Sequence, residues 1–381
     1  MDYIYLDNAA STIPDDDILK EFCRIAKENY ANPSALHKEG LKAEHIIKES
    51  AEKIALALGV TAEEIFFTSG GTEGNNLGVL GLAYSRKRTH KHVITTFGEH
   101  PSVSEVFKRL EGCGFEVTYL KPDEGGNIGI GQVIDSLRPD TGLVAVMHVH
   151  NETGAVYDIK SISEAVKAKS EAYMFVDGVQ GFGKSRLNLK NVDGYSFSGH
   201  KIHGIKGTGG LYIKKGVRVV PQILGGGQQY NIRSGTENTS GAVALSLAAE
   251  KSFETLDERM AYVSRLNLRL REGLLSLEGV YANSPENGLP YILNVSFTGV
   301  KSEVMLHTLA ADNVIVSAGS ACSAGKNGKS KNALNLMGFP KERYESAIRF
   351  SFSHLNTEAE VDMAVKAVEK NLVVLKRFVK R

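Results

Sequence analysis

The chain contains few cysteines, little net charge and no long apolar run. Three cysteines, Cys23, Cys113 and Cys322, occur in 381 residues, and their odd number and wide spacing argue against a disulfide framework. No apolar run approaches the length of a membrane span, and residues 1–7 lack the basic and apolar regions of a signal peptide. A formal net charge of +1 argues against a surface that binds nucleic acid. We therefore expect a cytoplasmic globular protein without membrane or nucleic-acid partners.

Strand-like apolar runs alternate with helical patterns through the first two-thirds of the chain. Apolar residues have helical spacing from 41 to 58 and from 161 to 170. Strands are expected at residues 65–68, 91–96, 115–120, 143–147, 173–177 and 210–213. This alternation is typical of a mainly parallel sheet with helices on both faces, and ligands of such sheets gather beyond the carboxyl ends of the strands.

The pattern changes after about residue 245. A long charged helical stretch is expected from 247 to 278, and shorter strands follow at 291–296 and 348–352, before a final amphipathic helix at 358–378. We interpret this region as a second, α+β domain that the N-terminal dozen residues join. The predicted division is a large domain at 14–250 and a small domain formed by 1–13 and 251–381.

A carboxylate and a lysine point to one particular cofactor. Asp177 ends an expected strand, and Lys201 follows 24 residues later (201 − 177 = 24) within a run of small and polar residues. Pyridoxal phosphate (PLP) needs such a pair, because a lysine binds it as a Schiff base while an aspartate pairs with its pyridinium nitrogen. The alternative interpretation is a strand end followed by a surface loop.

The segment 68–73, Thr-Ser-Gly-Gly-Thr-Glu, follows an expected strand and opens a helix. Glycines allow the backbone to approach a ligand there, and a helix N-terminus offers N–H groups to a phosphate. The alternative is a plain turn with Thr72 as the N-cap. The Rossmann and P-loop glycine spacings are absent, which disfavours nucleotide binding.

Several histidines also lie near expected strand ends. His100 could stack on a flat cofactor and transfer protons, or it could be a loop histidine beside a proline. His148 and His150 form a His-x-His pair, but no third metal ligand is evident, so no metal site is predicted. Asn151 is expected instead to contact a bound ligand.

Cys322 lies in the segment 317–325, whose residues have almost no side chain. A buried structural cysteine normally has bulky apolar neighbours, so an exposed, nucleophilic thiol is an equal alternative to a small buried one. The glycine-rich segment 225–236 is interpreted either as part of the site or as a surface loop.

Taken together and in order, these segments resemble the NifS/IscS-like cysteine desulfurases, which belong to the class V aminotransferase group with PLP fold type I. The resemblance covers nearly the whole chain. It is carried by residues 5–12, 30–37, 68–76, 99–100, 151–154, 177–180, 198–204, 233–236, 317–325 and 348–351. It implies an α/β PLP-dependent transferase fold, with a large domain built on a mainly parallel seven-stranded sheet flanked by helices and a smaller α+β domain.

The resemblance implies a cofactor role for each matching residue. Lys201 would bind PLP covalently, Asp177 would pair with its ring nitrogen, and His100 would stack on the ring and take part in proton transfer. Gln180 and Asn151 would contact the phenolic oxygen of the ring and its surroundings. The residues expected to hold the phosphate are Gly71, Thr72, Ser198 and His200, with Thr236 supplied by the partner subunit of a homodimer.

The resemblance also implies the substrate and the product. Arg349, aided by Asn32 and Asn151, would bind the carboxylate of L-cysteine, a task that suits a guanidinium fork. Cys322 would attack the substrate sulfur, so that alanine is released and a persulfide remains on Cys322. The expected partner is a sulfur acceptor, either an iron–sulfur scaffold or a tRNA-thiolation enzyme, and Cys322 could serve transiently as an iron–sulfur ligand.

Four positions depart from the family pattern. Gly178 stands where alanine is usual, His150 replaces an asparagine, Ile205 replaces a proline and Gln229 replaces a glutamate. None removes a group that the chemistry requires. Two alternatives remain: another class V PLP enzyme, such as a selenocysteine lyase or an aminotransferase, and a sulfur-relay scaffold without turnover. Cys322 argues against the aminotransferase, and the Asp177–Lys201 pair argues against the scaffold.

Overall fold

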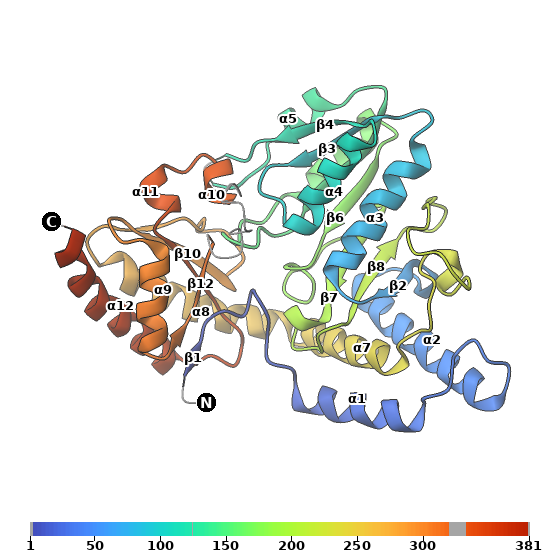
Figure 1. Ribbon diagram of the computed structural model, residues 1–381, viewed down its shortest axis with the longest axis horizontal. Coiled ribbons are helices and arrows are strands. Elements are labelled where there is room, and N and C mark those ends of the chain that lie inside the picture. The colour runs from blue at the N-terminus through green and yellow to red at the C-terminus, as the bar shows by residue number, and fades with distance from the viewer. Residues whose placement is uncertain (1–2, 124, 320–332, 380–381) are drawn as a thin grey trace.

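A seven-stranded sheet forms the centre of the larger lobe of the computed structural model, which describes residues 3–123, 125–319 and 333–379 (Figure 1). Its strand order is β2-β8-β7-β6-β5-β3-β4. The strands are β2 (Ile65–Thr68), β3 (His92–Thr96), β4 (Glu116–Leu120), β5 (Thr141–Met147), β6 (Tyr173–Asp177), β7 (Gly194–Ser198) and β8 (Gly209–Ile213). β8 is antiparallel to both of its neighbours, whereas β7, β6, β5, β3 and β4 pair in parallel. The mainly parallel seven-stranded sheet is thus confirmed.

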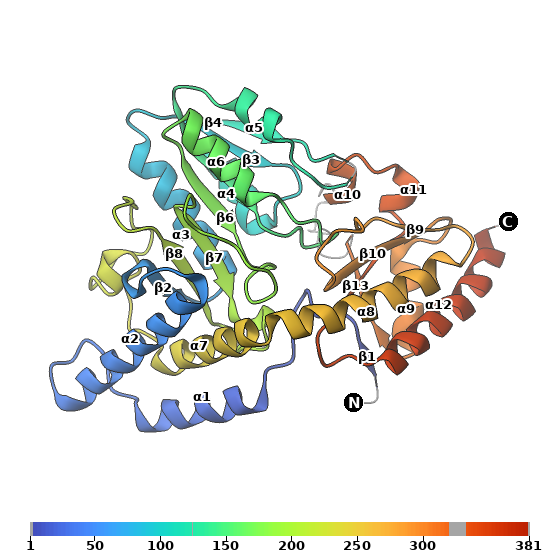
Figure 2. The same cartoon turned by 180° about the vertical axis from the view of Figure 1, so that it is seen from behind.

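Side chains of the central strands alternate between two cores, one on each face of the sheet. Val144 and Val146 of β5 belong to the core that α1, α2, α6 and α7 cover, and Leu143 and Ala145 belong to the core under α3 and α4. Figure 1 shows α3 and α4 in front of the sheet, and Figure 2 shows α6 on the opposite face. These helices are α1 (Asp16–Glu28), α2 (Lys38–Leu58), α3 (Gly71–Arg86), α4 (Pro101–Gly112), α6 (Ile159–Lys169) and α7 (Thr239–Glu254), with the short α5 (Ile130–Ser136) beside α6.

The smaller lobe contains an antiparallel sheet of order β12-β13-β10-β9. Its strands are β9 (Val280–Ala282), β10 (Ile292–Phe297), β12 (Ser317–Ala318) and β13 (Ala347–Ser351), and its helices are α8 (Leu256–Leu275), α9 (Ser302–Ala311), α10 (Ala333–Leu336), α11 (Lys341–Tyr344) and α12 (Glu358–Val379). The N-terminal strand β1 (Ile4–Tyr5) pairs in parallel with β11 (Val314–Ile315), and Ile4 and Leu6 lie in the core of this lobe. These contacts support the proposed small domain of 1–13 and 251–381, whose exact boundaries stay a prediction.

Two elements differ from the sequence-based expectation. β7 is a buried central strand that the sequence pattern does not predict. Its residues, Gly-Tyr-Ser-Phe-Ser, resemble the small and polar residues around Lys201 and not a continuous apolar run. The single helix expected at 247–278 is two helices, α7 and α8, which meet at Thr255 and run from one lobe to the other (Figure 2). Within the described residues, no helix is both long and apolar enough to cross a membrane.

The side chain of Gln229 covers the edge strand β2. Its amide Oε1 accepts from the backbone N–H of Phe67 at 2.5 Å, and its Nε2 donates to the carbonyl of the same residue at 2.9 Å. Gln229, Tyr230 and Asn231 all have positive φ, which brings this short turn against the strand. A glutamate at position 229 would lack the N–H donor. Glutamine therefore explains this departure from the family pattern, because it pairs with both backbone groups of Phe67.

Candidate cofactor and substrate site

A cavity of about 260 Å³ lies at the carboxyl ends of β2, β3, β5, β6 and β7. This is the edge at which parallel sheets place their ligands. The predicted site residues that line it are Gly71, Thr72, His100, Asn151, Asp177, Gln180, Ser198, His200 and Lys201. Ser102, Met147, Val149 and Val179 line it as well, although the sequence analysis does not indicate them. The structure therefore brings together side chains that lie up to 130 positions apart (201 − 71 = 130).

Asp177 is buried, and both of its carboxylate oxygens accept a hydrogen bond from an N–H donor. Oδ1 accepts from the backbone of Val179 at 3.0 Å, and Oδ2 accepts from Nδ2 of Asn75 at 2.8 Å. Asn75 is a fully buried residue of α3 that the sequence analysis missed. These bonds hold the carboxylate in one orientation at the edge of the cavity.

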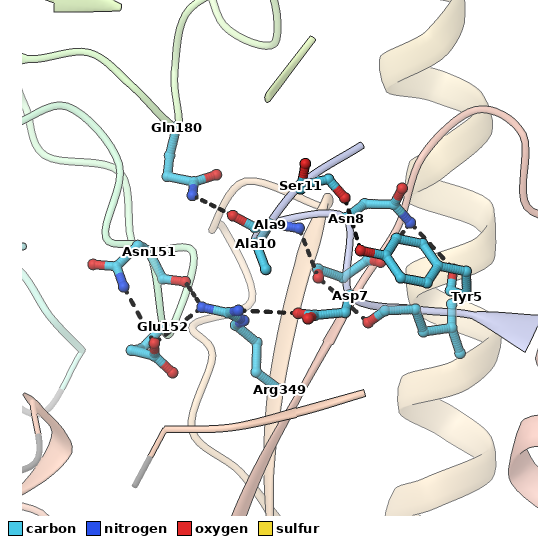
Figure 3. A network of polar contacts seen from close by, with 12 residues as sticks. Tyr5, Asp7, Asn8, Ala9, Ala10, Ser11, Asn151, Glu152, Gln180 and Arg349 are labelled. Atoms are coloured by element: carbon cyan, nitrogen blue, oxygen red, sulfur yellow. Dashed lines mark hydrogen bonds and ion pairs between the residues drawn. The ribbon is translucent and has the colours of Figure 1, made fainter. Parts of the chain in front are cut away.

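Lys201 lies in a 3₁₀ turn, Gly199–Lys201, directly after β7. Its Nζ donates to the carbonyls of Ala9 and Ala10 at 2.7 Å each, and Nε2 of Gln180 donates to the carbonyl of Ala9 at 2.9 Å. Figure 3 shows the N-terminal segment crossing between Gln180 and Arg349. The N-terminal residues thus contact the two lobes at the cavity.

His100 is the N-cap of α4, and its Nδ1 lies 2.7 Å from Oγ of Ser102. Burial is the main cause that lowers the pKa of His100; Asp177 opposes this shift, and Lys201 and Arg349 reinforce it. The imidazole is therefore mainly neutral near pH 7, as a group that accepts or donates one proton requires.

The start of α3 fits a phosphate group. The N-cap is Gly70, so Thr72 lies in the first turn and is not the cap that the alternative interpretation of this segment would require. A Cβ on Gly71 would lie 2.3 Å from Cγ2 of Val179, so the close approach of these two segments requires glycine. Oγ of Ser198 is buried beside this turn and has no hydrogen-bond partner in the described part of the chain.

Two further observations fit PLP. Oε1 of Gln180, which lines the same cavity, is also buried without a partner among the described residues. Burial, and after it the charge of Lys201, lowers the pKa of His200 to about 4, which leaves its ring neutral. An unpaired hydroxyl, a helix N-terminus, an amine and a carboxylate around one cavity are the groups that bind PLP.

The position of the Tyr195 ring explains why residue 178 is glycine and not the alanine that is usual in the family. A Cβ at position 178 would lie 1.9 Å from Cζ of the Tyr195 ring, which is itself buried on β7. The Tyr195 hydroxyl donates to the carbonyl of Gly178 at 3.3 Å. The tyrosine thus occupies the space in which the usual alanine methyl group would lie.

Arg349 of β13 is buried between two acidic side chains. It donates to Oδ1 of Asp7 at 3.1 Å, to Oε1 of Glu152 at 2.9 Å and to the carbonyl of Asn151 at 2.9 Å (Figure 3). Burial raises the pKa of Asp7, and Arg349 opposes this shift. Arg349 does not itself line the cavity but holds Asn151, which does. Its role as a carboxylate ligand stays a prediction.

Besides Arg349, two described residues among those predicted for the site, Asn32 and Thr236, do not line this cavity. Asn32 is exposed between α1 and α2, where its side chain accepts from the backbone of Ser34. Thr236 lines a separate cavity of about 210 Å³ together with Ser69. Cys322 lies outside the described residues. The roles of Asn32, Thr236 and Cys322 stay predictions.

The remaining departures from the family pattern have local structural roles. Nδ1 of His150 accepts from the backbone N–H of Thr153 at 3.1 Å, and burial lowers the pKa of His150 to about 4. Ile205 packs against the main core. Among the described residues, no group of three histidine, cysteine, aspartate or glutamate side chains is arranged to hold a metal ion.

Comparison with known proteins places the chain in a family. The model of the aminotransferase class-V family matches residues 4–363. A putative cysteine desulfurase IscS 1 of Bacillus subtilis is 39% identical, with 97% of this chain and 98% of the relative covered. A solved NifS-like protein aligns with a TM-score of 0.92 at 36% identity (98% and 100% covered), and the structure titled SspA in complex with cysteine aligns with 0.81 at 33% (93% and 100% covered). The chain therefore belongs to the class V aminotransferase family and has the PLP fold type I architecture of the NifS-like enzymes.

Proposed function

We propose that the protein is a PLP-dependent cysteine desulfurase, which converts L-cysteine to L-alanine and transfers the sulfur to Cys322. One observation carries this proposal: Lys201, Asp177 and His100 meet in one cavity beside the N-terminus of α3. Similarity to relatives named cysteine desulfurase over nearly their whole length supports the same activity. Other PLP reactions also use a lysine and a partner of the ring nitrogen, so the choice of sulfur chemistry rests on the relatives and on Cys322.

Each cavity residue has a defined task toward the cofactor. Lys201 would bind PLP through its amine, Asp177 would face the ring nitrogen, and Ser198 and the first N–H groups of α3 would hold the phosphate. When bound, PLP supplies an electron sink that weakens the bonds at the α-carbon of an amino-acid substrate. His100, which lines the cavity, would move a proton to or from the substrate.

The sulfur transfer balances without an external oxidant. L-cysteine and the Cys322 thiol give L-alanine and a Cys322 persulfide, because the thiolate attacks the substrate sulfur as its bond to carbon breaks. The proton lost by the thiol and a further proton transfer complete the alanine product. A thiol reductant or an acceptor protein then removes the outer sulfur from Cys322.

The proposal includes a homodimer and an acceptor. Thr236 lines a cavity together with Ser69, which lies just before the start of α3, and this supports a Thr236 contribution to the partner's phosphate site. The acceptor is a protein that receives persulfide sulfur for iron–sulfur clusters or for thiolation of tRNA. Residues near Cys322 would contact it.

The test uses the purified full-length chain with added PLP. We expect the visible absorption of lysine-bound PLP, together with equal amounts of sulfide and alanine from L-cysteine in the presence of a thiol reductant. Lys201→Ala should abolish the lysine-dependent absorption. Cys322→Ala should retain the cofactor absorption and lose sulfide release, with Cys113→Ala as the matched control because Cys113 is exposed and lies at the C-cap of α4, the end of that helix opposite to His100.

The outcomes separate the competing functions. Full activity of Cys322→Ala would reject the persulfide step, and an absorption spectrum shared by wild type and Lys201→Ala would reject PLP binding at this lysine. A wild type that binds PLP fully but produces neither alanine nor sulfide would favour the sulfur-relay alternative.

A further inference from the structure

A chain of hydrogen bonds, buried between Asp177 and Ser102 and partly buried at His100, connects the two proposed ring-facing residues, Asp177 and His100. Asn75 lies at its centre: Nδ2 donates to Oδ2 of Asp177 and to Oγ of Ser102, both at 2.8 Å, and Oδ1 accepts from Oγ of Ser196 at 2.5 Å. Asn75 and Ser196 are fully buried, and Ser102 is 8% exposed. Asn75 of α3 and Ser102 of α4 thus connect Asp177 of β6 to the histidine, and Ser196 of β7 donates to Asn75.

The carboxylate fixes the orientation of the Asn75 amide. Both carboxylate oxygens of Asp177 accept hydrogen bonds, so the amino group of Asn75 faces Asp177 and the amide oxygen faces Ser196. The second amino hydrogen is then directed to Oγ of Ser102. Every polar atom of Asn75 is used in this one orientation.

The hydrogen bond from Asn75 determines the direction of the bond between Ser102 and His100. Because Oγ of Ser102 accepts from Asn75, its own hydrogen is available to Nδ1 of His100, 2.7 Å away. The backbone N–H of Ser102 also donates to the same Nδ1, at 3.2 Å. A ring nitrogen that accepts from two donors carries no proton, so the proton of the neutral ring lies on Nε2.

We propose that Asn75 and Ser102 are positioning residues that keep His100 in the Nε2-protonated tautomer and align it with Asp177. This inference rests on the proposed function only for its purpose: His100 would begin the reaction with Nε2–H as a hydrogen-bond donor and with Nδ1 unavailable as a base. Both residues act through others and touch no reacting atom.

Three charged residues from other elements also affect the titration of His100. Asp177 on β6 favours its protonated form, whereas Lys201 in the turn after β7 and Arg349 on β13 disfavour it. None of these three residues is altered by substitution at Ser102. A change in titration caused by Ser102 therefore reports the loss of the hydroxyl donor.

Nuclear magnetic resonance of ¹⁵N-labelled histidine tests the proposal on the full-length protein, with and without PLP. His100→Gln identifies the His100 signals among the 11 histidines. Wild type should show Nδ1 without a proton and Nε2 with one. Ser102→Ala removes a donor that stabilises the neutral ring, so the titration midpoint of His100 should rise by about 0.3 to 1 pH unit, a two- to tenfold change in protonation constant.

The controls distinguish a positioning role from a structural one. Ser102→Thr retains the hydroxyl and should restore the wild-type midpoint, and Ser104→Ala, on the same helix, should leave it unchanged. Asn75→Leu should shift the midpoint in the same direction. If Asn75 acts through Ser102, the midpoint shift of the double variant should be smaller than the sum of the two single shifts.

A wild-type His100 with its proton on Nδ1 would overturn the inference, as would a Ser102→Ala midpoint no different from that of Ser104→Ala. Fully additive shifts of the His100 midpoint would show that Asn75 does not act through Ser102. The cofactor-free measurement does not depend on desulfurase activity. A protein that fails to release sulfide but shows the expected tautomer would therefore contradict the proposed function and leave the positioning role supported.

Discussion

Replacing Gly178 by alanine tests how the site is packed beneath the cofactor cavity. The new Cβ would lie 1.9 Å from Cζ and 2.4 Å from the hydroxyl oxygen of Tyr195. An ordinary contact begins near 3.4 Å, so the ring or the turn after β6 must move by about 1.5 Å (3.4 − 1.9). Tyr195 is 1% exposed, and its ring lies near His148 and Phe197, so it has little room to move.

Overpacking of this kind costs about 1–3 kcal/mol of the free energy of unfolding. We expect Gly178→Ala to lose an amount in that range in urea unfolding, and also to bind PLP more weakly, because the displaced turn carries Asp177 and Gln180. Tyr195→Leu removes the atoms that clash, at the expense of a buried ring. The double variant should therefore be more stable than the sum of the two single effects predicts, by about 1 kcal/mol or more.

Two results would refute this reasoning. One is a Gly178→Ala protein with wild-type stability and PLP affinity. The other is additivity in the double-mutant cycle, which would show that Tyr195 does not determine the residue at position 178. Gly131→Ala, at a glycine with open space around its Cβ position, is the matched control for a glycine-to-alanine change.

Three more predictions address pH, the sheet edge and the substrate site. Burial raises the pKa of Glu99 to about 8, so its stabilising effect is complete below about pH 4.5 and is lost as the pH rises through 8. Glu99→Gln should therefore gain stability relative to wild type between pH 5 and 8.5 in urea unfolding, and a pH-independent difference would contradict this. Gln229→Glu removes the donor to the Phe67 carbonyl and should lower the free energy of unfolding by about 1–3 kcal/mol, whereas an unchanged value would show that the edge pairing is unimportant. Arg349→Gln should raise KM for L-cysteine tenfold or more, because the substrate carboxylate would lose its charged partner, and an unchanged KM would exclude Arg349 from the substrate site.

The sequence allowed the strands and their functional ends to be predicted, because short-range patterns determine both. Asp177 ends a run of buried apolar residues, and the glycine-rich turn at Gly71 follows another. Parallel strands place such ends at one edge of a sheet, so their meeting in one cavity could be expected without knowledge of side-chain contacts. β7 escaped prediction because a fully buried central strand can contain polar residues when their partners are also buried, as Ser196 does with Asn75.

Asn75 could not be assigned from the sequence because its partners come from three other elements. One signal was present: Gly71, Gly74, Asn75 and Gly78 have the helical spacing of a single face, and that face packs on the sheet. An asparagine among glycines on a buried helix face must find hydrogen-bond partners, since an unpaired buried amide is destabilising. The pattern predicts that partners exist but not which ones they are. Their identity depends on how α3 packs on β6 and β7. This packing positions the Asp177 carboxylate and the Ser196 hydroxyl on either side of the Asn75 amide.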